Sequence, residues 1–125
     1  MAAGTATLTE IAHTSAKKVV WTWTSGTGAE GGTVTKQTSW PFDGKLVGFT
    51  TIPGSAGEQP SAAYDITITD AQGHDVLLGA GANRSNAAAE SVAEASLGAV
   101  AGSRLTLNVS NAGDAKTGVV VLFIR

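Results

Sequence analysis

The sequence predicts an all-β protein, an antiparallel, jelly-roll-like β-sandwich of about eight strands in one domain, residues 1–125. Three observations predict it. Apolar and polar residues alternate with a period of two along much of the chain. Turn-forming Gly, Pro, Asn and Asp separate the alternating stretches. Hydrophobic residues make up 42% of the chain, enough for a core, whereas only 14% are charged, against about 25% in an average soluble domain.

Four stretches carry the strongest strand pattern: 17–24, 64–69, 105–110 and 118–124. In the first, Val19, Trp21 and Trp23 share one face, which favours core packing for both tryptophans. The last is apolar on both faces and is therefore predicted to be a central strand. Four weaker strands complete the set: 5–12, 33–38, 45–52 and 76–78.

Turns are predicted at four dipeptides: Asp43-Gly44, Pro53-Gly54, Gln72-Gly73 and Ala112-Gly113. The stretch from Asn86 to Leu97 is ambiguous. It contains good helix formers behind an Asn86 cap, and it is equally compatible with a loop followed by an irregular edge strand. Residues 1–12 are expected to form an N-terminal arm or an edge strand.

Charge and composition exclude several classes of partner. The net charge is −2, and the only adjacent basic pair is Lys17-Lys18, so nucleic acid is not an expected partner. The longest apolar run, Val119–Ile124, is far shorter than the roughly 20 residues of a membrane span, and the first residues lack the pattern of a signal peptide. A chain without cysteine has no disulfide and no thiolate metal site, which suits maturation in a reducing cytoplasm.

One glycine motif imitates a nucleotide-binding fingerprint. Gly26-Thr-Gly28-Ala-Glu-Gly31 fits G-x-G-x-x-G and follows a strand. Dinucleotide binding by this motif, however, requires a helix that begins at the third glycine. The residues that follow, Gly32-Thr-Val-Thr, favour β-structure. The motif is therefore interpreted as a hairpin loop, and no cofactor is expected.

Three acidic residues, Asp65, Asp70 and Asp75, recur at intervals of five. Carboxylates beside a turn are calcium ligands, but the segment lacks the spacing of an EF-hand loop. The favoured interpretation is that Asp70 and Asp75 flank a hairpin and accept hydrogen bonds from nearby amides, so no metal is expected.

The sequence contains few candidate catalytic residues. The chain has two histidines, His13 and His74, and neither lies in a recognisable nucleophile context. We therefore expect the protein not to be an enzyme.

Four residues are candidates for an interface. Trp40 precedes a proline in the loop-like segment Ser39-Trp-Pro-Phe42, so Trp40 and Phe42 are placed for a contact outside the core. Leu8 and Ile11 alternate with polar residues in a segment suited to adding a strand to a neighbouring sheet edge. A sugar-stacking role for Trp40, with an acidic residue nearby, is the alternative.

Three segments resemble small virion-associated proteins of tailed bacteriophages. They run from Tyr64 to Ser85 (YDITITDAQGHDVLLGAGANRS), from Leu105 to Arg125 (LTLNVSNAGDAKTGVVVLFIR) and from Ala16 to Trp23 (AKKVVWTW). The resemblance touches most of the chain, but its motifs are strand and hairpin patterns without a catalytic signature. It therefore indicates kinship more strongly than role.

The resemblance implies a capsid decoration, or cement, protein. Such proteins are small β-proteins, made in the host cytoplasm, that sit on the major capsid protein lattice as dimers or trimers and reinforce the shell. The expected partners are thus the major capsid protein and further copies of the chain. Another virion position, at a head-fibre base, tail or neck, is the first alternative, and a carbohydrate-binding β-sandwich is the second.

Overall fold

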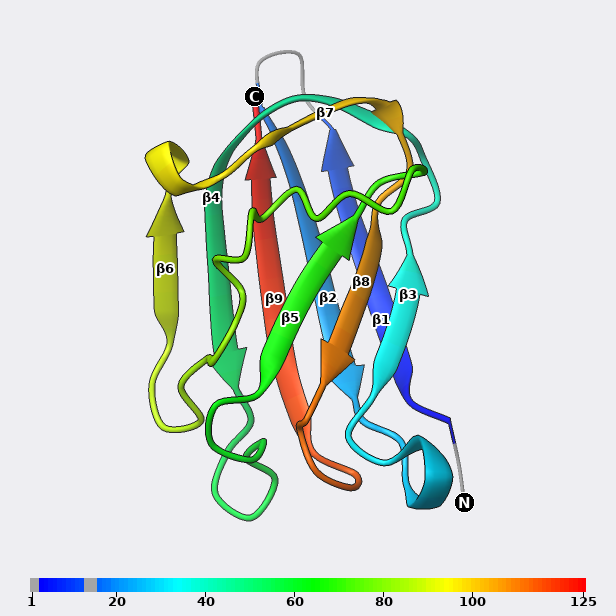
Figure 1. The fold of residues 1–125 in the computed structure, drawn as a ribbon, viewed down its shortest axis with the longest axis vertical. Helices are drawn as coiled ribbons and strands as arrows, with labels where there is room; N and C mark the ends of the chain where they lie inside the picture. The colour runs from blue at the N-terminus through cyan, green and yellow to red at the C-terminus, as the bar shows by residue number, and fades with distance from the viewer. Residues whose placement is uncertain (1–2, 13–15) are drawn as a thin grey trace.

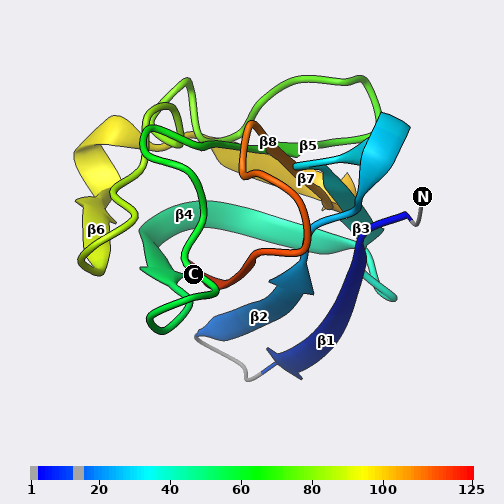
Figure 2. The ribbon, with the colours of Figure 1, turned by 90° about the horizontal axis from the view of Figure 1, so that it is seen from below.

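A computed structural model describes residues 3–12 and 16–125, and its two antiparallel sheets face each other as a β-sandwich (Figure 1; Figure 2). The predicted all-β architecture is confirmed, with nine strands in the described residues. His13 lies outside those residues. No helix in the described part of the chain is long and apolar enough to cross a membrane.

The larger sheet has the strand order β1-β2-β9-β4-β6, and β7 also pairs with β4. Its strands are β1 (Thr5–Ala12), β2 (Lys17–Thr24), β4 (Phe42–Pro53), β6 (Glu90–Ala93), β7 (Ala99–Ser103) and β9 (Thr117–Ile124). The smaller sheet has the order β3-β8-β5, formed by β3 (Val34–Gln37), β5 (Asp65–Thr69) and β8 (Thr106–Ser110). β9 occupies the centre of the larger sheet, as its two-sided apolar pattern predicts, and β1 forms one edge.

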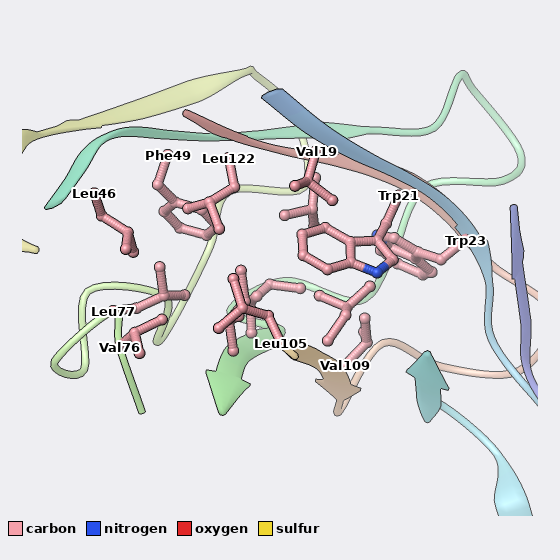
Figure 3. Packing of buried hydrophobic residues seen from close by; sticks show 14 of the residues in the cluster. Val19, Trp21, Trp23, Leu46, Phe49, Val76, Leu77, Leu105, Val109 and Leu122 are labelled. Atoms are coloured by element: carbon pink, nitrogen blue, oxygen red, sulfur yellow. The ribbon is translucent and has the colours of Figure 1, made fainter. Parts of the chain in front are cut away.

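The core lies between the two sheets (Figure 3). Val19, Trp21 and Trp23 on β2 all point into it and are at most 1% exposed, which confirms the predicted role of the tryptophans. They pack opposite Val109 of β8 and Leu105, which directly precedes β8. Large buried side chains of this kind each contribute about 1.5–3 kcal/mol to folding, so the inward face of β2 is a main source of stability.

Asp43-Gly44 is not a turn, which corrects the sequence-based expectation. It lies inside β4 at a shift in the register with β7. Gly44 adopts a φ of +131°, and a Cβ there would overlap the carbonyl oxygen of Arg125. Directly after it, Lys45 and Arg125 exchange two backbone hydrogen bonds of 3.0 and 2.9 Å. The glycine therefore serves as a bulge that lets β4 continue along β9.

Residues 76–78 also differ from the expectation, because they form a turn rather than a strand. The segment that contains them runs beside β5 and covers its edge through three backbone hydrogen bonds. These join Val76 N to Ile68 O, Ile66 N to Gly81 O and Arg84 N to Tyr64 O, at 2.7–2.8 Å. An irregular segment thus protects a sheet edge that would otherwise expose unpaired amides.

The ambiguous stretch 86–97 contains a loop, the edge strand β6 and one 3₁₀ turn, Glu94–Ser96. The loop-and-edge-strand alternative therefore describes residues up to Ala93, and the helical part is limited to this single turn. The Gly26–Gly31 motif is also not a hairpin loop, because β2 and β3 belong to different sheets. It belongs to the connection that crosses from the larger to the smaller sheet, and it contains the 3₁₀ turn Gly28–Glu30.

Candidate interaction surface

The larger sheet has an outward side that its own core does not use, which we call the outer face. It consists of the side chains that alternate with the buried ones along each strand. They are Thr5, Thr7, Thr9, Ile11, Lys18, Val20, Thr22, Thr24, Gly48, Thr50, Ile52, Ser91, Ala93, Thr117, Val119, Val121 and Phe123. Most of them are β-branched, so the face is formed by stiff side chains of similar height.

Strand register arranges these side chains in rows across the sheet. In one row, Val121 lies between Val20 and Thr50. In the next, Val119 lies between Thr22 and Ile52. Ile11, Ile52 and Phe123 remain 38%, 40% and 39% exposed, which is unusual for large apolar residues in a strand. The face is therefore a broad surface with a single charge among its described side chains, on which apolar side chains are interspersed with the hydroxyl groups of Thr and Ser.

Among the described residues of the outer face, Lys18 is the only charged one. It lies in the row that also contains Ile11 and Phe123, near one end of the sheet. Its ammonium group is 5.9 Å from the centroid of the Phe123 ring, a cation–π contact. The charge is therefore held at the end of the face, away from the central rows.

The four candidate interface residues have different environments. Ile11 belongs to the outer face, and Trp40 is 46% exposed in the loop between β3 and β4. Leu8 is half-buried on the inward side of β1 and packs against the core. Phe42 is only 3% exposed, so it is not available for the contact outside the core that was predicted for it. Its ring packs beside Trp40, with the two ring centroids 6.4 Å apart.

The backbone around Trp40 is held by defined hydrogen bonds. A carboxylate oxygen of Glu10 accepts from the amides of Ser39 and Trp40 at 3.1 and 3.4 Å. The Thr38 hydroxyl donates to the Trp40 carbonyl at 2.8 Å. The sequence therefore displays an exposed indole on an anchored loop, beside an acidic residue supplied by β1.

The aspartates act as local turn acceptors. Asp75 accepts from the amides of Ile68, Leu77 and Gly79 at 3.0–3.2 Å. Asp70 accepts from the amides at positions 72 and 74, both at 3.0 Å. This is the arrangement favoured from the sequence. Within residues 3–12 and 16–125, no group of three or more acidic or histidine side chains is placed to hold a metal ion.

A buried polar cluster lies on the inner side of β4, and sequence reasoning did not find it. The Arg84 side chain, from a residue that is 6% exposed, donates through Nε to the Thr51 hydroxyl and through Nη1 to the Ala80 carbonyl, both at 2.9 Å. Its guanidinium carbon is 5.2 Å from the centroid of Phe49, and Nε is 3.6 Å from a Glu90 carboxylate oxygen. Nη2 has no hydrogen-bond partner. The cluster links the segment that covers β5 to the larger sheet.

The Tyr64 hydroxyl belongs to the same region and is buried without a hydrogen-bond partner. Burial raises the pKa of this phenol above its ordinary value of 10.0, and the neighbouring Thr51 and Arg84 offset part of the rise. Because the folded-state pKa is the higher one, the native protein holds this proton more tightly than the unfolded chain.

We therefore expect the contribution of Tyr64 to the stability of the fold to be lost at alkaline pH. The contribution is constant below the unfolded pKa of about 10 and falls as pH rises above it. Urea titrations at increasing pH should show a decline in the free energy of unfolding that is smaller in Tyr64→Phe than in the wild type. Tyr64 is the only tyrosine, so tyrosinate absorbance reports this group alone. Ionisation at the ordinary pKa, with the tryptophan circular dichroism still native, would contradict the expectation.

The signal for the outer face was present in the sequence but had two interpretations. A strand that is apolar on both sides, such as β9, is typical of a strand covered on both faces. Here Val119, Val121 and Phe123 lie on the uncovered side. Arg84 had no comparable signal, because its burial depends on the segment folded over β5.

The chain matches no protein-family model, no curated protein sequence and no solved structure. No pocket is found in the part of the chain that the structure describes. The outer face and the Trp40 loop, which expose large apolar side chains, are the candidate surfaces for binding a partner.

Proposed function

We propose that this chain is a non-enzymatic structural protein of a tailed-bacteriophage virion. In this proposal it is made in the host cytoplasm, binds the outer surface of the major capsid protein lattice and stabilises the head. The observation that carries the proposal is the outer face, with its rows of Thr, Val and Ile and a single charge at one end. The resemblance of three segments to phage virion proteins supplies the biological setting.

The physical properties of the outer face suit a contact protein of a large assembly. β-branched side chains lose little rotamer freedom when they are covered, so contact costs little entropy. A surface with few charges also avoids the desolvation of ions. Weak contacts of this kind, repeated over a symmetric lattice, add up to firm attachment through multivalency.

The proposal is tested by the abundance of the chain in particles. Virions purified from the source of the chain are resolved on quantitative gels, and the chain is counted relative to the major capsid protein. A decoration protein is expected at a copy number comparable to that of the shell subunit. A few copies per particle would instead assign it to a head-fibre base, tail or neck, and absence from particles would overturn the virion role.

Binding of carbohydrate is a second candidate, favoured by the exposed Trp40 beside Glu10. Its test is optical, because Trp21 and Trp23 are buried and only Trp40 is exposed to a solute. A sugar that stacks on Trp40 should change the emission of the wild type and leave that of Trp40→Phe unchanged. Under the decoration proposal, a glycan array gives no hits and added sugars leave the emission as it was.

A further inference from the structure

We propose that the outer face binds the outer face of a second copy of this chain, forming a two-fold symmetric, sheet-on-sheet dimer. This inference rests on the proposed function and assigns the outer face to the contact between copies within the assembly, which leaves the contact with the shell to the remaining surface, including the Trp40 loop. Its test requires no virion. It is argued from the size of the face, its chemistry and the position of its charge.

The size of the face matches what a dimer needs. Five strands lie side by side from β1 to β6. With strands about 4.8 Å apart and about seven residues of about 3.3 Å along each, the face measures roughly 550 Å² in projection. Its accessible area is larger because side chains project from it, and a stable interface buries about 800 Å² per partner. A contact that uses the whole face therefore lies towards the lower end of the sizes found for specific interfaces.

The central rows of the face resemble the inner side of a β-sandwich. Sheets that pack face to face lie about 10 Å apart and interdigitate side chains that point from alternate positions. The central rows present Val20, Val119 and Val121 on the two middle strands, with Thr50 and Ile52 beside them on β4. Because these side chains are β-branched, they are already fixed in the conformation that a flat contact requires.

The position of the charge favours a second copy over a strongly charged partner. β9 is the central strand of the face. With the two-fold axis lying between the two faces and crossing over the middle of β9 at right angles to it, the two Lys18 side chains lie at opposite ends of the dimer. Each Lys18 starts about 10 Å from the axis along the strand, so the two ammonium groups are roughly 20 Å apart, beyond the screening length at physiological salt. Each then lies over the partner row that contains Thr24 and Thr117, whose hydroxyls accept hydrogen bonds. One lysine offers too little charge to attract a polyanion.

The test is the mass of the purified chain by analytical ultracentrifugation across a concentration series. The wild type is expected at twice its chain mass of 12.5 kDa. Val121→Glu places a carboxylate near the axis in both copies and should give monomers. The matched control, Thr67→Glu, adds the same charge at an exposed position on the smaller sheet and should remain dimeric. Circular dichroism of each variant verifies the fold.

A second variant keeps the test decisive if Val121→Glu does not fold. Val121→Thr retains the β-branched shape and exchanges one methyl for a hydroxyl in each copy, which should weaken the dimer about tenfold or more. A wild type that is monomeric at every concentration overturns the inference and leaves the face for the shell. A dimer unaffected by both substitutions at position 121 also overturns it, because another surface then forms the contact. Neither result changes the copy-number test of the virion role.

Discussion

Replacement of Arg84 by alanine is expected to lower the free energy of unfolding by about 3 kcal/mol, one of the two largest effects that we predict. The substitution removes a side chain packed over Phe49 and leaves a cavity next to the Thr51 hydroxyl, which loses its donor. The Ala80 carbonyl loses its donor as well. Urea denaturation monitored by tryptophan fluorescence measures the change.

Two further variants separate packing from charge. Arg84→Met also removes the donors to Thr51 and Ala80, but it retains most of the volume and removes a buried guanidinium whose Nη2 has no partner, so we expect a loss of about 1–2 kcal/mol, smaller than that of Arg84→Ala. Glu90 is 43% exposed, so Glu90→Gln, which removes only its charge, should cost less than about 1 kcal/mol. If Arg84→Met proves as harmful as Arg84→Ala, the polar contacts rather than the packing hold the cluster together, contrary to our account.

The parts of the fold that local patterns determine could be predicted from the sequence. Strict alternation in β2, with Val19, Trp21 and Trp23 on one side, identified both a strand and its core face, because side-chain direction in a strand depends only on residue parity. The direction of these side chains does not depend on which strands pair. The central position of β9 was predicted from its apolar composition, although its outer side chains are not covered by another layer formed by the described residues.

The features that were missed depend on tertiary pairing. β7 was not expected, and β6 was one of two alternatives for an Ala-rich segment with helix-forming residues. Both become strands because β4 offers them an edge. Gly44 resembled a turn because a bulge and a turn use the same residue type. Of the four residues predicted as contacts, Trp40 and Ile11 are exposed, whereas Phe42 is buried and Leu8 is half-buried against the core. Sequence alone does not distinguish these environments.

The second large effect is expected at Gly118, which lies directly opposite Trp23 in the register of β9 with β2. A Cβ at Gly118 would lie 2.5 Å from Cζ2 and 2.8 Å from Cε2 of the Trp23 ring. The indole has little freedom to retreat, because it is buried and its centroid is 5.8 Å from that of Tyr64. We therefore expect Gly118→Ala to lower the free energy of unfolding by about 3 kcal/mol, although alanine suits an ordinary strand better than glycine.

A matched control and a double-mutant cycle assign this loss to the indole. Gly48 is also a strand glycine of the larger sheet, but its added Cβ would meet the exposed Phe123 ring at 3.2 Å, which a small rotation relieves, so Gly48→Ala should change stability by less than about 1 kcal/mol. In a Trp23→Leu background, Gly118→Ala should cost at least about 1 kcal/mol less than in the wild type, because the shorter side chain vacates the space that the methyl enters. Equal costs in the two backgrounds would mean that the backbone of β9, rather than the Trp23 ring, requires glycine at position 118.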